Sequence, residues 1–178
     1  MSVIQHELEL IFPAAKVPRP VLCEMFREHD VVFNVVSANV SQHRGHFHFL
    51  LLGSEQAVKA GEEYLRREGI EVQVLRSEPH TGTLPARPKR LGSNPSEPHM
   101  ARKLWLTYLD MVRDRPVIWE MACRFDVCFD IRQSSVGKGV NIMAILLEGP
   151  TSHVDAAIEF LHEQGVEVEP IEKSVVEG

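Results

Sequence analysis

The sequence contains no apolar run that approaches the roughly 20 residues a membrane-spanning helix needs. Its first residues, MSVIQHELEL, lack the basic and apolar stretches of a secretory signal peptide, so we expect no signal there. Lys and Arg total 19 against 25 Asp and Glu, which gives a formal net charge of −6 at pH 7. Because nucleic-acid binding needs clustered cations that displace counterions from phosphates, this charge argues against a broad nucleic-acid surface.

Cysteine is also scarce, with three residues. An odd and sparse set does not form the framework of a disulfide-rich secreted protein, and it fits a reducing cytosol. We therefore expect a soluble, cytoplasmic protein. The spacings of Cys23, Cys123 and Cys128 match neither a zinc ribbon nor a CxxC redox motif, so we interpret all three as buried thiols.

The usual catalytic motifs are missing as well. The chain has no GxxxxGK phosphate loop, no nucleophile elbow and no Ser–His–Asp signature. The sequence therefore supports no enzymatic activity, and we expect no cofactor.

The sequence does contain an internal repeat. When the chain is aligned on itself so that Arg19 falls on Arg115, RPVLCEM matches RPVIWEM, and LELIF matches LWLTY. In the same register EYLRREGIEVQVL matches EFLHEQGVEVEPI. Matches that recur in order without a gap indicate two copies of one small domain. We assign the first repeat to residues 1–76, a linker to 77–101 and the second repeat to 102–178.

The linker is rich in Pro, Gly and Ser and has almost no large apolar residues. Such a composition cannot bury enough surface to order itself, so it predicts a flexible coil whose ends lie on the order of 25–30 Å apart. That reach allows the two repeats to pack side by side. We interpret the basic stretch ARPKR, residues 86–90, as part of this solvated coil, with a docking motif as the alternative.

The sequence patterns predict the same order of helices and strands in both repeats. In the first, alternating apolar residues or β-branched runs predict strands, and 3.6-residue periodicity bounded by Pro20, Ser54 and Gly69 predicts two helices. The expected strands are Glu7–Phe12, Val31–Val40, residues 46–53 and Ile70–Leu75. The order βαββαβ favours a ferredoxin-like α+β sandwich, in which two helices cover one face of a four-stranded antiparallel sheet. The predicted fold is two such sandwiches in tandem.

The uncovered face of each sheet raises a packing question. The third strand of the first repeat is apolar on both sides, with Phe47 and Phe49 on one and Leu50 and Leu52 on the other. A strand of this kind requires cover on both faces, and the other repeat is the nearest source. Asn34 and its counterpart Asp130 lie on the uncovered side of the second strand, so we expect them near an interface or a crevice.

These segments together resemble the NIL domain. This module is ferredoxin-like and ACT-related, and it is found at the C-terminus of the ATPase subunit of bacterial methionine-import ABC transporters and attached to some ferredoxins. The resemblance covers Val3–Arg76 and Arg102–Val175. Its most telling segment is FNVVSANV, Phe33–Val40, since the family commonly places an Asn before a hydrophobic pair followed by Ser-Ala.

The resemblance implies a function. Paired NIL domains of the transporter bind methionine across their interface, so a ligand site is expected between the two repeats, formed by Asn34, Val35, Val36, Ser37, Ala38, Asp130, Ile131 and Arg132. The amide of Asn34 can both donate and accept hydrogen bonds, and Asp130 with Arg132 offers charges for an α-ammonium and an α-carboxylate. The alternative is that Asn34 bonds a neighbouring backbone group and that Asp130 pairs with Arg132.

Three histidines gather in HRGHFH, at His43, His46 and His48. His46 and His48 share one face of a strand, which makes a transition-metal site geometrically possible. No carboxylate or cysteine lies near them in the sequence to complete a familiar ligand set. We favour surface histidines and expect no metal.

Two functional hypotheses follow. The first is a non-enzymatic sensor or regulatory protein that binds a small molecule, an amino acid with methionine as first candidate, between its repeats. The second is a ligand-free interaction or assembly module. In both, the repeats form an internal pseudo-dimer, a homodimer is possible, and a protein partner of unknown identity completes the function without nucleic-acid binding or membrane insertion.

Overall fold

The computed structural model describes residues 2–17, 19–109, 112, 115–136 and 139–171, so the end of the predicted second repeat, 172–178, lies outside the described residues. The first repeat contains β1 (Val3–Pro13), a short 3₁₀ turn (Ala14–Lys16), α1 (Val21–Glu28), β2 (Val32–Val40), β3 (Arg44–Ser54), α2 (Glu55–Arg67) and β4 (Glu71–Pro79). The second contains β5 (His99–Leu109), α4 (Val117–Arg124), β6 (Cys128–Val136), β7 (Val140–Pro150), α5 (Thr151–Glu163) and β8 (Glu167–Pro170).

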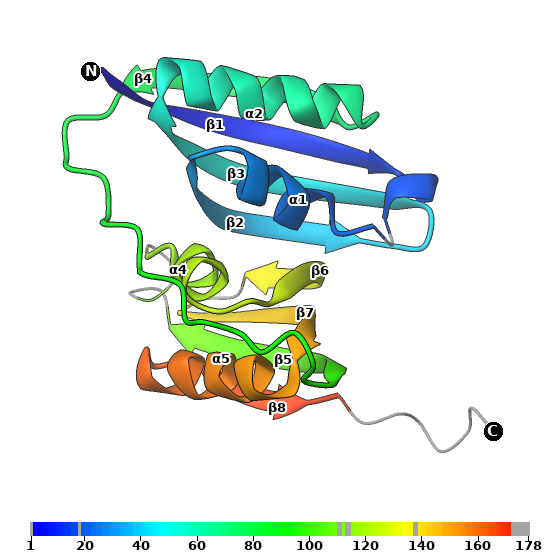
Figure 1. The fold of residues 1–178 in the computed structure, drawn as a ribbon. Coiled ribbons are helices and arrows are strands. Elements are labelled where there is room, and N and C mark those ends of the chain that lie inside the picture. The colour runs from blue at the N-terminus through cyan, green and yellow to red at the C-terminus, as the bar shows by residue number, and fades with distance from the viewer. Residues whose placement is uncertain (1, 18, 110–111, 113–114, 137–138, 172–178) are drawn as a thin grey trace.

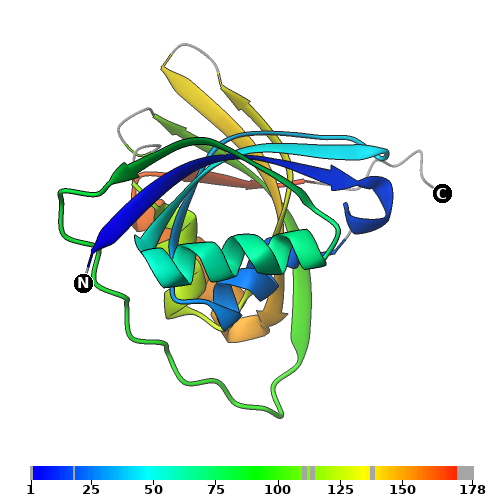
Figure 2. The ribbon, with the colours of Figure 1, turned by 90° about the horizontal axis from the view of Figure 1, so that it is seen from above.

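Both repeats have the same sheet topology. The strand orders are β2-β3-β1-β4 and β6-β7-β5-β8, with antiparallel neighbours. The helices of both repeats lie on the same side of the two sheets (Figures 1 and 2). The predicted tandem of ferredoxin-like α+β units is therefore confirmed. None of the helices in the described part of the chain combines the length and apolar character needed to cross a bilayer.

Local signals in the sequence set the helix ends. Ser54 caps α2 as predicted, because its Oγ accepts a hydrogen bond of 3.1 Å from the N–H of Ala57. Gly69 follows the same helix with a φ of +86°, a conformation that L side chains rarely adopt. Pro20 and Pro116 stand immediately before α1 and α4, where a missing N–H costs nothing.

The core lies between the sheets and the helices and is continuous across both repeats. Alternate residues of β1, such as Leu8 and Leu10, are fully buried on the helix side. The rings of Phe33 in β2 and Phe129 in β6 lie 5.4 Å apart between centroids, and each is 1% exposed. Since burying one such side chain contributes about 1.5–3 kcal/mol, this junction is a substantial source of stability.

The two repeats meet along β2 and β6, with α1 against β6 and α4 against β2 (Figure 1). The prediction that one repeat covers the bare sheet face of the other is therefore wrong. Electrostatics opposes such cover on the first sheet. The outer face of the first sheet carries two carboxylate–histidine pairs, Glu7 with His48 and Glu9 with His46, whose desolvation opposes burial. Contact along the strand edges instead joins two apolar cores.

The segment between the repeats is more ordered than its composition predicts. Strands β4 and β5 extend into the predicted linker, so that residues 77–79 and 99–101 are paired with β1 and β7. The guanidinium of Arg87 lies 3.0 Å from Asp30 Oδ1 and stands 4.9 Å over the ring of Phe26. The N–H of Leu91 donates to the carbonyl of Arg124 at 2.8 Å. The segment thus crosses both repeats, and Arg87 of its basic stretch docks onto the chain itself.

Candidate functional site

Two hollows lie where the repeats meet. The space between the lining atoms is about 340 Å³ in the first and about 310 Å³ in the second, with the solvent at their open sides included. The first is lined by Asn34, Val35, Leu106, Tyr108, Val112, Arg115, Val117, Ile118, Met143 and Val166. The second is lined by Phe12, Val17, Arg19, Pro20, Val21, Leu22, Val40, Gly45, Phe47, Phe129, Asp130 and Ile131.

The two hollows are related by the internal repeat. The first is lined by Asn34 of β2 and by Arg115, which lies just before α4, so the wall combines both repeats. In the second, Asp130 of β6 faces the start of α1 at Arg19. The register that places Arg19 on Arg115 also places Asn34 on Asp130. Each hollow therefore needs both copies of the domain.

A β-bulge in β2 separates the predicted site residues of the first repeat into two groups. The pairing of β2 with β3 shifts between Val35 and Ser37, which leaves Val36 at the irregularity. Beyond it Ser37 stands opposite His48, and Ala38 is buried opposite Phe47. Asn34 and Val35 thus line the first hollow, whereas Val36, Ser37 and Ala38 do not.

The second repeat has the matching irregularity. The pairing of β6 with β7 shifts between Ile131 and Gln133, at Arg132. Asp130 and Ile131 line the second hollow, and Arg132 Nη2 lies 3.0 Å from Asp130 Oδ2. The alternative that Asp130 and Arg132 pair with each other is thus seen in the structure.

Sequence reasoning missed the two arginines that stand across the hollows. Arg19 lies 3.9 Å from Glu24 and Arg115 lies 4.0 Å from Glu120, so the same ion pair occurs in both repeats. Half-exposed pairs of this kind add little stability, but they position each guanidinium at a hollow. The signal was available: Arg-Pro-Val is identical in the two copies.

Helix starts contribute a second positive feature to each hollow. Pro20 and Pro116 are the N-cap residues of α1 and α4, and neither provides a side-chain cap. The first N–H groups of a helix have no partners within it and carry a partial positive charge. Val21 and Val117, the first residues of the two helices, line the hollows, so each hollow presents an arginine and a helix N-terminus together.

The second hollow contains a carboxylate that is costly to ionise. The Asp130 side chain is 14% exposed, and burial raises its pKa to about 6 even though Arg132 acts in the opposite direction. The nearby Glu148 raises this pKa further. Arg132 is close to Oδ2 but not aligned for a hydrogen bond, and among the described residues no other donor reaches that atom. The corresponding position of the first hollow, Asn34, is uncharged.

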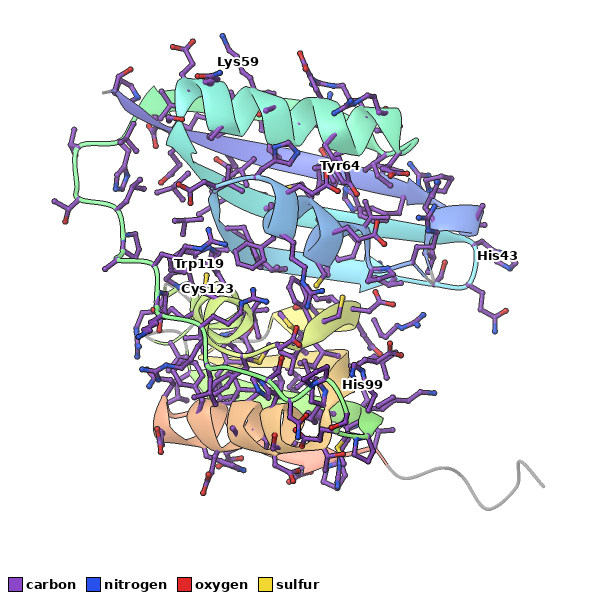
Figure 3. The ribbon with its side chains drawn as sticks, in the orientation of Figure 1. His43, Lys59, Tyr64, His99, Trp119 and Cys123 are labelled. Carbon is purple, nitrogen blue, oxygen red and sulfur yellow. The ribbon has the colours of Figure 1, made fainter. Side chains whose placement is uncertain are left out.

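The histidines do not converge on one point. His43 is exposed in the turn after β2 and points outward (Figure 3), while His46 and His48 each contact a separate glutamate. Within the described ranges, no three or more His, Cys, Asp or Glu side chains are grouped as they would be to hold a metal ion.

Comparison with known proteins finds relatives that are similar over part of their length. The chain is 31% identical over 72 residues to the methionine import ATP-binding protein MetN 2 of Listeria innocua, which covers 38% of this chain and 21% of that protein. The corresponding protein of Listeria monocytogenes is also 31% identical over 72 residues, with the same coverage. The chain thus spans about a fifth of the length of these curated relatives.

Solved structures show distant similarity. Aminoacylhistidine dipeptidase from Vibrio alginolyticus is 8% identical with a TM-score of 0.42, covering 95% of this chain and 39% of that chain. A putative glycine cleavage system transcriptional repressor is 8% identical with a TM-score of 0.32, covering 96% of this chain and 99% of that chain.

The NIL domain family model matches this chain twice, at residues 7–74 and 103–170. Each match spans the sheet and the two helices of one repeat. The chain belongs to the NIL domain family and carries two copies of the domain in tandem.

Proposed function

We propose that this protein is a non-enzymatic sensor that binds a free amino acid in the first hollow, between its two NIL domains. The observation that carries the proposal is a cavity built jointly by the two repeats, with Asn34 on one side and Arg115 with the start of α4 on the other.

The wall chemistry fits the two ends of an amino acid. A carboxylate is favoured beside the Arg115 guanidinium and near the partial positive charge at the N-terminus of α4, where the N–H of Val117 itself donates to the Arg115 carbonyl at 2.8 Å. The side-chain oxygen of Asn34 is an acceptor of the kind an ammonium group needs.

The remaining wall is apolar and suits an uncharged side chain. Leu106, Val112, Met143 and Val166 contribute to it. Methionine is our first candidate, because its flexible thioether fills irregular apolar space and because the curated relatives are named as methionine import proteins.

The second hollow is less suited to the same ligand. Three aromatic rings, Phe12, Phe47 and Phe129, line it, and the carboxylate of Asp130 replaces the amide of Asn34. An ionised Asp130 repels a ligand carboxylate, whereas the amide of Asn34 does not. We therefore assign the sensing role to the first hollow.

Sensing follows from the shared walls. A ligand that contacts β2 and α4 together favours the packing of the two repeats in which those elements lie close, and a partner protein can bind that arrangement selectively. We place this activity in the cytoplasm and leave homodimerisation as a further prediction.

Thermal unfolding tests the proposal. The purified, EDTA-treated protein is heated with each of the twenty amino acids, homocysteine and S-adenosylmethionine. A ligand at a hundred times its Kd adds about 2.7 kcal/mol, which raises Tm by several degrees. We expect one selective shift that is lost in Arg115→Met and Asn34→Ala but kept in Arg19→Met, the matched change at the second hollow. A flat panel, or an equal shift in Arg115→Met, would overturn the assignment.

An assembly function has one observation in its favour. Leu109 and Val140 stand opposite each other at the end of the second sheet and are 55% and 42% exposed, and Ile142 beside them is 41% exposed. An apolar patch of this kind is a possible contact surface for another chain. Sedimentation velocity of wild type and Leu109→Lys tests it, since a dimer through this patch dissociates in the variant.

A further inference from the structure

We propose that Cys23 and Cys128 form an oxidisable thiol pair that a hydroperoxide converts into a disulfide between the two repeats. The inference is independent of the amino-acid site and rests on a junction with a cysteine on each side.

The two thiols lie at the contact of α1 with β6. Cys23 is fully buried in α1 of the first repeat, as expected, while Cys128 is half-buried at the start of β6 in the second. The two cysteines influence each other across this contact, because Cys128 lowers the pKa of Cys23 and the main-chain N–H of Phe129, the residue after Cys128, acts in the same direction.

Neighbouring contacts hold α1 and β6 together. Arg27, one helical turn after Cys23, donates from Nη2 to the carbonyl oxygen of Val127 at 3.3 Å and lies 3.5 Å from Asp126. These contacts fix the residues immediately before Cys128 against α1. The two cysteines therefore belong to elements that are already in contact.

The surroundings favour a negative charge on the pair. The hydrogen bond from Cys128 lowers the pKa of Cys23 to about 7, aided by the Arg27 guanidinium and opposed by burial. The pKa of Cys128 is raised by the same hydrogen bond. Cys123, the third cysteine, shows the contrast, because burial raises its pKa to about 11. A pair that shares one proton contains a thiolate, the reactive form, near neutral pH.

Access is through Cys128. This residue lines a third, partly open hollow together with Pro20, Leu146 and Glu148, and we take this hollow as the route for a small hydroperoxide. A proton shift along the hydrogen bond from Cys128 to Cys23 places the thiolate on the accessible sulfur.

The reaction then has two balanced steps. The Cys128 thiolate attacks one peroxide oxygen and breaks the O–O bond, which yields a sulfenic acid and, after protonation of the leaving oxygen, an alcohol or water. The Cys23 sulfur attacks the sulfenic sulfur, and the displaced hydroxide takes the Cys23 proton and leaves as water. In total two thiols are oxidised to one disulfide and one hydroperoxide is reduced.

The pair acts on one hollow only. The positions that correspond to Cys23 and Cys128 at the other junction are Trp119 and Val32, so no thiols meet there. Pro20 and Asp130 line both the second hollow and the hollow beside Cys128. A disulfide would thus fix α1 against β6 at the second hollow and leave the first unrestrained.

Hydrogen peroxide is the probe. After treatment of the whole native protein and alkylation in denaturant, we expect one free thiol instead of three, and peptide mapping should give a Cys23–Cys128 link within one chain. The oxidised protein should also unfold several degrees higher, because the link closes a long loop. Cys123→Ser should keep both results, and Cys128→Ser should lose both.

Mapping of the wild-type protein decides the matter without any variant. Three titratable thiols after peroxide, a link that includes Cys123, or a link between two chains would each overturn the proposal.

Discussion

The indole nitrogen of Trp119 in α4 donates a hydrogen bond of 2.9 Å to the carbonyl oxygen of Val31, across the junction between the repeats (Figure 3). The corresponding carbonyl in the other repeat, that of Val127, accepts from Arg27 of α1 instead. The α4–β2 junction and the α1–β6 junction therefore use different donors for equivalent backbone carbonyls. The first is buried, since Trp119 is 2% and Val31 is 1% exposed, whereas Arg27 is partly exposed.

Trp119→Phe tests how far this bond joins the repeats. The change removes the donor, leaves the buried Val31 carbonyl without it and opens space beside it, so we expect a loss of about 2–3 kcal/mol in the free energy of unfolding. Urea denaturation measures it. Arg27→Met at the other junction is the control and should cost less, because water can replace its donor. Equal losses would show that burial of the carbonyl is not what matters.

Much of the fold is predictable from the sequence because the decisive signals are local. The alternation in β1, the Ser54 cap and the glycine after α2 each act within a few residues. The second repeat keeps the alternation and has Gly165 after α5, although Pro150 replaces the serine cap. The duplication is equally plain in the one-dimensional sequence, since RPVLCEM and RPVIWEM differ at only two of their aligned positions.

The junction was not predictable in the same way. The surface through which the repeats meet depends on the total free-energy cost of burying each face. Part of that cost comes from the Glu–His pairs across β1 and β3, which form only once the strand register is set. The bulge at Val36 is equally invisible in the sequence, and it separates Asn34 from Ser37 and Ala38. Asn34 and Asp130 were expected at a crevice, and they line hollows, but along strand edges rather than between sheet faces.

Gly149 and Gly53 occupy equivalent positions in the two repeats but have different surroundings. A Cβ on Gly149 would lie 2.5 Å from the carbonyl oxygen of Asp126 and 3.2 Å from Val127 Cα, whereas on Gly53 it would lie 3.3 Å from the carbonyl oxygen of Asp30. Backbone atoms cannot rotate away as side chains can. We expect Gly149→Ala to cost about 1–3 kcal/mol more than Gly53→Ala by urea denaturation. Equal costs would show that the backbone at Asp126 and Val127, just before β6, moves easily to make room for the added Cβ.

Glu62 is the buried hydrogen-bond partner of His6, and the pair links α2 to β1 beneath the first sheet. Removing one member leaves the other buried without its partner, so Glu62→Ala should lower the free energy of unfolding by about 3 kcal/mol. Glu63→Ala, at the exposed neighbouring position, controls for the loss of a charge from the same helix. The second repeat has Arg102 and Ile158 at the equivalent positions, so it lacks this interaction. Similar stabilities of the two variants would refute the role of the pair.

Asp130 makes stability depend on pH in a predictable direction. Burial raises its pKa in the folded protein from 3.8 to about 6, so between these values the folded state binds more protons than the unfolded state. Its ionisation therefore costs stability above about pH 6, and the cost disappears as pH falls below about 4. A shift of this size corresponds to at most about 3 kcal/mol.

Asp130→Asn, which introduces the side chain found at Asn34, removes that cost. We expect the variant to be more stable than wild type by roughly 1–3 kcal/mol at pH 8, with the difference falling towards zero near pH 4. Urea denaturation at several pH values gives the difference directly, and Asp155→Asn at an exposed position provides the baseline. A difference that does not change with pH would mean that Arg132 compensates fully for the buried charge, and the second hollow would then hold a stable ion pair rather than a strained carboxylate.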